Sequence, residues 1–145
     1  MIYKLLTISL LLSANNFAFS QNVQPQNLGT SIGPSCVGVD YKSWSGCVGS
    51  MEVTDAPASW GNTTYTGEFA SGKFSGRGIL KTKGWTYYGE FIDGTRDGYG
   101  TISYSGGSKY SGQWSRGVRH GIGKYVYENR QGILIGEFKD GVDGK

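Results

Sequence analysis

The chain has 145 residues, including 25 glycines, with 14% aromatic residues, 17% charged residues and a formal net charge of +3 at pH 7. This length suits one domain and leaves no room for a second large core. Three prolines and no strict glycine triplet exclude collagen, and the aromatic content excludes a disordered glycine-rich tail. The charges are interspersed along the chain, which argues against nucleic acid as a partner.

Residues 1–20 have the pattern of a secretory signal peptide. Lys4 is their one charged residue, and the apolar run over 5–14 is shorter than the roughly 20 residues that span a bilayer. We expect cleavage near Ser20 and an exported protein, periplasmic or secreted; a retained membrane anchor is the alternative. Residues 21–34 are polar without apolar periodicity and are expected to form a mobile leader.

Two cysteines, Cys36 and Cys47, follow the leader. In an exported chain we expect a disulfide between them, which would stabilise by roughly 2–3 kcal/mol on the chain-entropy model. Free thiols and a metal site are the alternatives, but two cysteines and one distant histidine fall short of four zinc ligands. We predict no metal and no cofactor. Residues 35–61 are expected to form an N-terminal cap in which Trp44 covers the end of the following array.

One fourteen-residue phrase occurs three times, at 65–78, 87–100 and 110–123, and a fourth copy begins with Leu134 in place of the tyrosine. A unit this short cannot bury an apolar face alone, so the copies are expected to stack. The shared positions are Tyr65, Gly67, Phe69, Gly76 and Gly78 in the first copy, Tyr87, Gly89, Phe91, Gly98 and Gly100 in the second, and Tyr110, Gly112, Trp114, Gly121 and Gly123 in the third.

Each copy has the pattern of a β-hairpin with about six residues in each strand. Pairs such as Ser71 with Gly72 and Asp93 with Gly94 suit the tight turn between the strands. A side-chain period of two places the rings of the first strand and the glycines of the second on one face, so the rings should lie over a floor without Cβ atoms. The glycines predicted to share this face are Gly76, Gly78, Gly98, Gly100, Gly121 and Gly123.

The phrase resembles the MORN repeat (membrane occupation and recognition nexus) over residues 65–144, and residues 36–49 look like the leader of exported bacterial members. The resemblance implies an all-β fold, an elongated, twisted antiparallel sheet of stacked β-hairpins. Residues 62–145 would hold three full units and one truncated unit behind a disulfide-pinned N-terminal cap. It also implies a role in protein docking, in dimerisation or in phospholipid contact, between which the fold does not decide.

No catalytic group of residues is recognisable. His120 stands inside the third copy without a nucleophile or an orienting carboxylate in pattern, so a structural or solvated role is favoured over a general base. Glu68, Glu90 and Glu137 recur at one position of the phrase, where a row on the solvent face is favoured over a cation-binding ladder. We therefore predict that the protein is not an enzyme.

The sheet face opposite the rings carries the candidate binding residues, because exposed apolar groups on a sheet can mark a partner site. The alternative is that sheet twist or the N-terminal segment covers them. The strand at 135–139 offers a second candidate surface, since an open edge can accept a partner strand. The candidate residues are Ile79, Tyr88, Tyr99, Ile122, Val126, Lys81 and Lys124.

The favoured function is that of an exported, non-catalytic repeat module for protein–protein interaction or structural scaffolding, including self-association. The alternative is weak binding to phospholipid or to the envelope surface. In that alternative, basic residues of the array meet the headgroups, each contributing about 1 kcal/mol near an anionic surface, with acidic neighbours offsetting the gain. The basic residues considered are Lys81, Lys83, Arg119 and Lys124.

Overall fold

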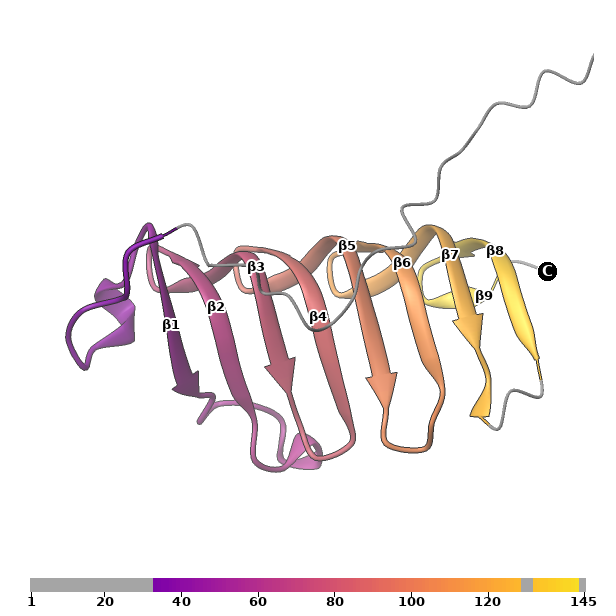
Figure 1. Ribbon diagram of the computed structural model, residues 1–145, viewed down its shortest axis with the longest axis horizontal. Helices are drawn as coiled ribbons and strands as arrows, with labels where there is room; N and C mark the ends of the chain where they lie inside the picture. The colour runs from indigo at the N-terminus through magenta and orange to yellow at the C-terminus, as the bar shows by residue number, and fades with distance from the viewer. Residues whose placement is uncertain (1–32, 129–131, 144–145) are drawn as a thin grey trace, which may run out of the picture.

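A computed structural model describes residues 33–128 and 132–143, which form one antiparallel sheet of nine strands in chain order. The strands lie side by side along the long axis of a twisted molecule (Figure 1). The predicted all-β sheet of stacked hairpins is confirmed. Residues 1–32, with the predicted signal peptide and most of the leader, lie outside the described part. The strands are β1 Cys47–Glu52, β2 Thr64–Ala70, β3 Lys73–Lys81, β4 Trp85–Ile92, β5 Thr95–Tyr104, β6 Lys109–Ser115, β7 Val118–Val126, β8 Ile133–Lys139 and β9 Val142–Asp143, and the 3-10 helices are η1 Tyr41–Ser43 and η2 Ala58–Trp60.

Two kinds of strand alternate in the array. Ring strands (β2, β4, β6 and β8) carry the start of the phrase, and glycine strands (β3, β5 and β7) carry its end. Their 7 to 10 residues exceed the predicted length of about six, partly because a register shift adds two residues to the second strand of each complete hairpin. Each complete unit is a ring strand followed by a glycine strand.

The tight turns within the hairpins have the left-handed backbone that their sequences predict. Their first central residues, Ser71, Asp93, Arg116 and Asp140, have φ between 48° and 51°, and each precedes a glycine whose φ is also positive. Positive φ at both central positions defines a type I′ turn, whose twist matches that of the flanking strands. These turns therefore set the register of every hairpin.

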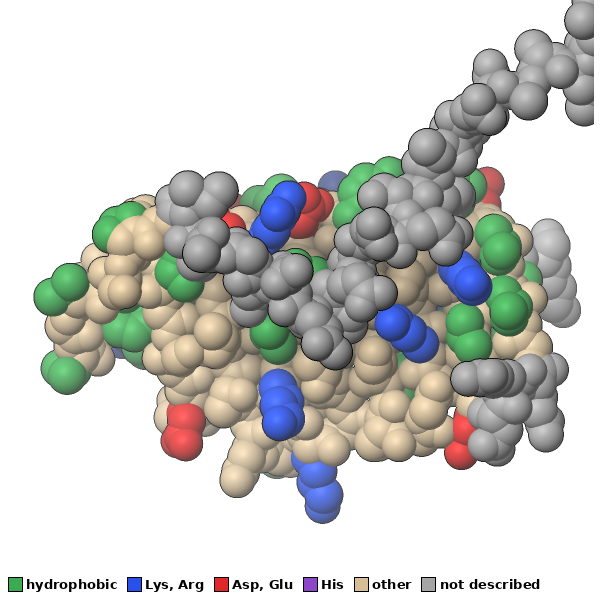
Figure 2. Space-filling view, viewed as in Figure 1, with side chains coloured by type: hydrophobic (Ala, Val, Ile, Leu, Met, Phe, Trp, Pro, Cys, Tyr) green, Lys and Arg blue, Asp and Glu red, His purple; other side chains and the backbone are tan. Residues whose placement is uncertain are grey.

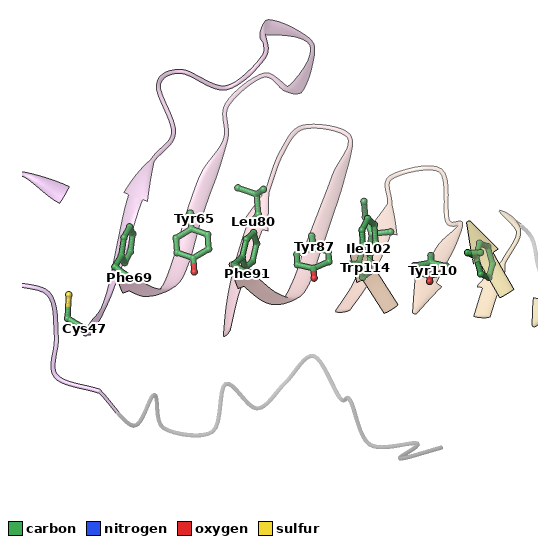
Figure 3. Packing of buried hydrophobic residues seen from close by; sticks show 10 residues of the cluster. Cys47, Tyr65, Phe69, Leu80, Tyr87, Phe91, Ile102, Tyr110 and Trp114 are labelled. Atoms are coloured by element: carbon green, nitrogen blue, oxygen red, sulfur yellow. The ribbon is translucent and has the colours of Figure 1, made fainter. Parts of the chain in front are cut away.

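Aromatic rings form a continuous series along one face of the sheet (Figure 3). Tyr65, Tyr87 and Tyr110 are 0% exposed, and the rings meet edge to face, an arrangement that aromatic pairs prefer. The centroid distances are 4.9 Å for Trp44–Phe69, 5.2 Å for Phe69–Tyr65, 5.2 Å for Tyr65–Phe91, 5.2 Å for Phe91–Tyr87, 5.1 Å for Tyr87–Trp114, 5.4 Å for Trp114–Tyr110 and 4.8 Å for Tyr110–Phe138.

A row of glycines crosses the sheet beneath the rings. A Cβ atom on Gly67 would lie 2.5 Å from the Cα of Gly78, and one on Gly78 would lie 2.5 Å from Cζ of Tyr65, so neither position has room for a side chain. The predicted floor without Cβ atoms is confirmed for the second glycine of each pair. The row, in spatial order, is Gly49, Gly67, Gly78, Gly89, Gly100, Gly112, Gly123 and Gly136.

The first glycine of each Gly-x-Gly pair was placed on the wrong face by the sequence. Gly76, with φ of 58°, sits at a β-bulge, and a Cβ there would meet the carboxylate of Glu68 on the face opposite the rings. The register shift leaves two residues of β3, Gly76 and Arg77, without a partner in β2, and the left-handed backbone of Gly76 turns its Cβ position away from the rings, whereas Phe74 stacks on Tyr65 on the ring face. Gly98 and Gly121 repeat this departure beside Glu90 and Gln113.

The bulge explains the recurring acidic position. Oε1 of Glu68 accepts a hydrogen bond from the backbone N–H of Arg77 at 2.9 Å, and the Tyr65 hydroxyl donates to the backbone carbonyl of Glu68 at 2.9 Å. The Arg77 N–H and the Glu68 carbonyl, which the bulge removes from the β-ladder, thus both have a hydrogen-bond partner. Glu90 and Gln113 act alike, so these side chains serve the backbone, which neither sequence interpretation anticipated.

The N-terminal cap has the same strand pairing as the repeat units. Cys47, Gly49 and Met51 of β1 stand opposite a ring strand as Gly76, Gly78 and Leu80 do, so β1 is a glycine strand. Trp44 supplies its ring: a Cβ on Gly49 would lie 2.6 Å from Cζ3 of Trp44. The predicted role of Trp44 is confirmed.

The disulfide fastens this cap. Cys36 and Cys47 are bonded, which confirms the predicted bridge and rules out the thiol and metal alternatives. Residues 34–36 run parallel to β1, with Cys36 N–H donating to the Val48 carbonyl and Val48 N–H donating to the Pro34 carbonyl, both at 2.9 Å. The outer edge of β1 is therefore partly covered.

Replacing Gly100 by valine is expected to lower the free energy of unfolding by about 1–3 kcal/mol, because its Cβ would lie 2.6 Å from Cε2 of Tyr87. Gly84→Val is the matched control, since nothing lies within 4 Å of a Cβ there. Thermal melts compare the two. Equal melting temperatures for Gly100→Val and the wild type would refute the packing of ring on glycine.

Stability is expected to fall at alkaline pH. Burial raises the pKa of Tyr110 from 10.0 to about 12, and it also raises the pKa of Tyr65 and Tyr87. Because the folded pKa exceeds the unfolded one, this stabilisation is complete below about pH 10 and is lost as the pH rises toward about 12. Thermal melts across that range measure the loss, and a melting temperature constant above about pH 10 would contradict it.

Candidate docking faces

A groove of about 490 Å³ lies on the ring face near the N-terminal end of the array. Phe74, Phe91 and Leu80 are among its apolar lining residues, Trp60 also borders it, and Arg96 contributes its cationic side chain. The contacts of Arg96 show whether this side chain is available to a ligand or serves the fold.

Arg96 fastens the second unit to the third. Its Nη2 donates to the carbonyl of Gly117 at 2.7 Å, while its own carbonyl accepts from the Gly117 N–H at 2.9 Å. The guanidinium carbon lies 4.5 Å from the ring centroid of Trp114 and 5.3 Å from that of Trp85, a cation–π arrangement. Burial lowers the pKa of Arg96. This side chain is an inter-unit lock.

The same position recurs in each unit, nine residues after the tyrosine. Phe74 stacks on Tyr65 at 3.7 Å in the first unit, and Arg119 repeats the Arg96 lock in the third by donating to the carbonyl of Gly141 at 2.7 Å. The sequence analysis missed this position because it holds phenylalanine in one unit and arginine in the other two, so no single residue type repeats there. Its constant offset within the phrase was the available signal.

The basic residues proposed for lipid contact do not share a surface. Arg119 lies against the rings of Tyr110, Tyr125 and Phe138 on the ring face, whereas Lys81 and Lys124 alternate with ring-face residues and lie on the opposite face. The sequence-based grouping of Arg119 with these lysines is therefore wrong. Arg119 lies on the ring face because a guanidinium group stacks favourably on aromatic rings.

The face opposite the rings, here called the outer face, carries exposed apolar residues toward its C-terminal end. Tyr99 is 64% exposed, Ile122 49%, Ile133 60% and Ile135 64%. The pairing register sets Lys124 opposite Ile135 and Val126 opposite Ile133, and Gln113 links Tyr99 to Ile122 by hydrogen bonds. We call Tyr99, Ile122, Lys124, Val126, Ile133 and Ile135 the outer patch.

The predicted binding residues fall into two groups. Tyr99, Ile122, Val126 and Lys124 lie in the outer patch. The remaining ones, Ile79, Tyr88 and Lys81, lie on β3 and β4, where Ile79 and Tyr88 pair with one another and are half-buried. Thr101 and Ser111, joined by a hydroxyl–hydroxyl hydrogen bond of 2.9 Å, separate the groups.

Two isoleucines of the patch were missing from the prediction. Ile133 and Ile135 alternate with Leu134 and Gly136 along β8, so the period of two already assigned them to the outer face. The face seen in Figure 2 mixes basic, acidic and hydrophobic side chains, and hydrophobic ones lie at the β7–β8 end as well as at the β1 end and along the upper edge.

The described residues include no group of three or more His, Cys, Asp or Glu side chains placed to hold a metal ion. His120 is exposed on β7. No helix among residues 33–128 and 132–143 has the length and apolar character needed to cross a membrane. Within this part of the chain, the two sheet faces and the strand edges are the surfaces to consider.

The fold defines a β-repeat protein whose unit is one hairpin packed on its neighbours. Residues 65–86, 87–109 and 110–131 each match the family model for the MORN repeat, so the resemblance is supported over three consecutive repeats. Each match begins at the tyrosine of a complete unit. MORN repeats are typically interaction or binding modules and are generally not enzymatic. No curated protein sequence matches the chain.

Replacing Arg96 by leucine is expected to destabilise the fold by about 1–3 kcal/mol, because the Gly117 carbonyl loses its donor and Trp114 loses its cation. Arg77→Leu, on the exposed outer face, is the control and should stay within about 0.5 kcal/mol of the wild type. Urea titration followed by near-ultraviolet circular dichroism measures both. Equal losses in the two variants would contradict the lock.

Proposed function

We propose that the protein is an exported, non-catalytic module that docks a partner protein on the outer patch. The exposure of Ile122, Ile133 and Ile135 around Lys124 is the observation that carries this proposal. An apolar cluster with a charge among its members suits a partner surface of apolar side chains with an acidic group, because desolvated apolar contacts give affinity and charges give orientation. The signal-peptide pattern of residues 1–20 supports export.

The rigidity of the array favours docking on this face. The ring stack and the arginine locks hold neighbouring hairpins in one register, so the patch is spread over β5, β7 and β8 without depending on a loop. A preorganised surface avoids the entropy cost of ordering on binding. The scaffold therefore presents the patch in a fixed geometry.

Phospholipid binding is a weaker proposal. On the outer face Lys81 and Lys124 lie on separate strands, and Glu137 stands opposite Ile122 near the patch. Acidic neighbours offset the attraction of basic residues to an anionic surface. The lipid proposal is retained as one arm of the test.

The test uses the double variant Ile122→Glu with Ile135→Glu in a crosslinked pull-down of the mature protein from envelope extract. We expect recovery of the specific partner to fall at least about tenfold, about 1.4 kcal/mol of binding free energy. Thr64→Glu with Ser103→Glu is the matched control, because both residues are exposed on the outer face outside the patch. Equal recovery with both double variants would refute the patch.

Two further measurements separate the remaining parts of the proposal. Flotation with anionic vesicles should leave the protein in the dense fraction, whereas flotation that is lost at high salt would support lipid binding instead. Cell fractionation with sequencing of the mature N-terminus tests export. Intact Met1 in the cytoplasmic fraction would overturn that part.

A further inference from the structure

The two ends of the sheet carry complementary kinds of strand. β1 is a glycine strand at one end, and β8 is a ring strand with Leu134, Gly136 and Phe138 at the other. Inside the array a ring strand is always followed by a glycine strand. A second copy's β1 placed beside β8 would continue this alternation.

The edge of β8 has a gap of the right length. β9 pairs with Phe138 and Lys139, and residues 133–136 have no strand on that side within the described part of the chain. Among the described residues, nothing lies within 4 Å of a Cβ position on Gly136, whereas a Cβ on Gly67 would lie 2.5 Å from the Cα of the glycine paired with it. The place taken by Gly78 beside Gly67 is therefore open beside Gly136.

The register inside the array predicts how β1 would fill this gap. Gly67 pairs with Gly78, Tyr65 with Leu80 and Thr64 with Lys81. Transferred to β8, this register sets Gly49 of the second copy opposite Gly136, and Met51 of that copy opposite Leu134. Pairing of β1 would then start beyond β9, so the two strands would not compete for one place.

Side-chain size at the junction is also complementary. In the complete units a tyrosine ring covers the glycine floor, but Leu134 takes the tyrosine position in β8. β1 already brings its own ring, because Trp44 covers Gly49. A smaller residue on β8 thus leaves room for the ring that the incoming strand carries.

The cap opposes this pairing at the β1 end. Residues 34–36 occupy the backbone groups of Val48 on the outer edge, and Cys36 Cβ lies 3.2 Å from a Cβ position on Gly49. The Cys36–Cys47 bridge ties this segment to β1. While the bridge is closed, the edge that β8 would need is partly covered.

We propose that the disulfide gates head-to-tail association, in which β1 of one copy pairs with β8 of another once residues 34–36 have left the outer edge of β1. A dithiol reductant opens the bridge: it reduces Cys36 and Cys47 to two thiols and is itself oxidised to a disulfide. Residues 34–36 then leave Val48, and its N–H and carbonyl become available to β8. The interface is heterologous, so association yields chains of copies unless the rotation closes a ring.

The test measures molar mass by light scattering for the mature protein, oxidised and after treatment with dithiothreitol, and for Cys36→Ser with Cys47→Ser. We expect a monomer when oxidised and a mass that rises with concentration in the other two samples. Gly136→Val should abolish the rise, because the valine would meet Gly49 of the second copy, yet it has open space in the monomer. The double variant Ile122→Glu with Ile135→Glu tests the outer-patch proposal in the partner pull-down. Failure of that proposal is therefore measured separately from failure of this one.

A position-specific readout completes the test. In the background without native cysteines, Glu52→Cys and Ile133→Cys on separate molecules should be joined by a short bismaleimide, whereas Glu52→Cys and Lys73→Cys should not. Association of the oxidised protein, a reduced protein that stays monomeric, or association that survives Gly136→Val would each overturn the proposal. Loss of the near-ultraviolet circular dichroism in the double serine variant would overturn it too, since the bridge would then hold the fold and gate nothing.

Discussion

Everything in this sheet depends on a tyrosine ring lying flat over two glycines that face each other across paired strands. The ring of Tyr65 fills the space that a Cβ on Gly78 would need, and its hydroxyl donates to the carbonyl of Glu68 that the bulge has freed. One side chain thus supplies apolar burial and satisfies a polar group of the backbone. The bulge, the glycine floor and the ring are therefore one device, and none of the three works without the others.

Because the unit repeats, its ring packing forms one continuous core along the sheet. Each tyrosine meets the aromatic residue of its own strand and that of the next ring strand, so the core passes from unit to unit without a break. Arg96 and Arg119 close the other side of the ring layer and bond the turn of the following unit. Since the core is shared in this way, the ring layer is largely filled, and the candidate binding residues lie on the outer face and at the two ends of the sheet.

Much of the fold follows from the fixed spacing of tyrosine and glycine. The phrase predicted the hairpins, their tight turns, the ring face and the array, because these depend on local backbone preference and on a period of two. Gly76 was assigned to the wrong face because a bulge is a pairing irregularity that one strand alone does not reveal. The roles of Glu68 and Arg96 were missed for a related reason: each acts on the backbone of another strand. The outer patch was partly predicted, but Ile133 and Ile135 belong to an incomplete copy that the phrase did not highlight.

The strands lie in the sheet in the order of the sequence, and this order affects how the chain folds. Every strand from β1 to β8 pairs with its immediate neighbours in the sequence, and the disulfide joins residues separated by 11 positions. Contacts of such short range lower the loop-closure cost of folding, so a domain of this kind folds fast for an all-β protein. A hairpin can pack as soon as the preceding one exists, without waiting for distant segments. Growth of the native structure can therefore keep pace with a chain that emerges from one end, as it does from a ribosome or a translocation channel.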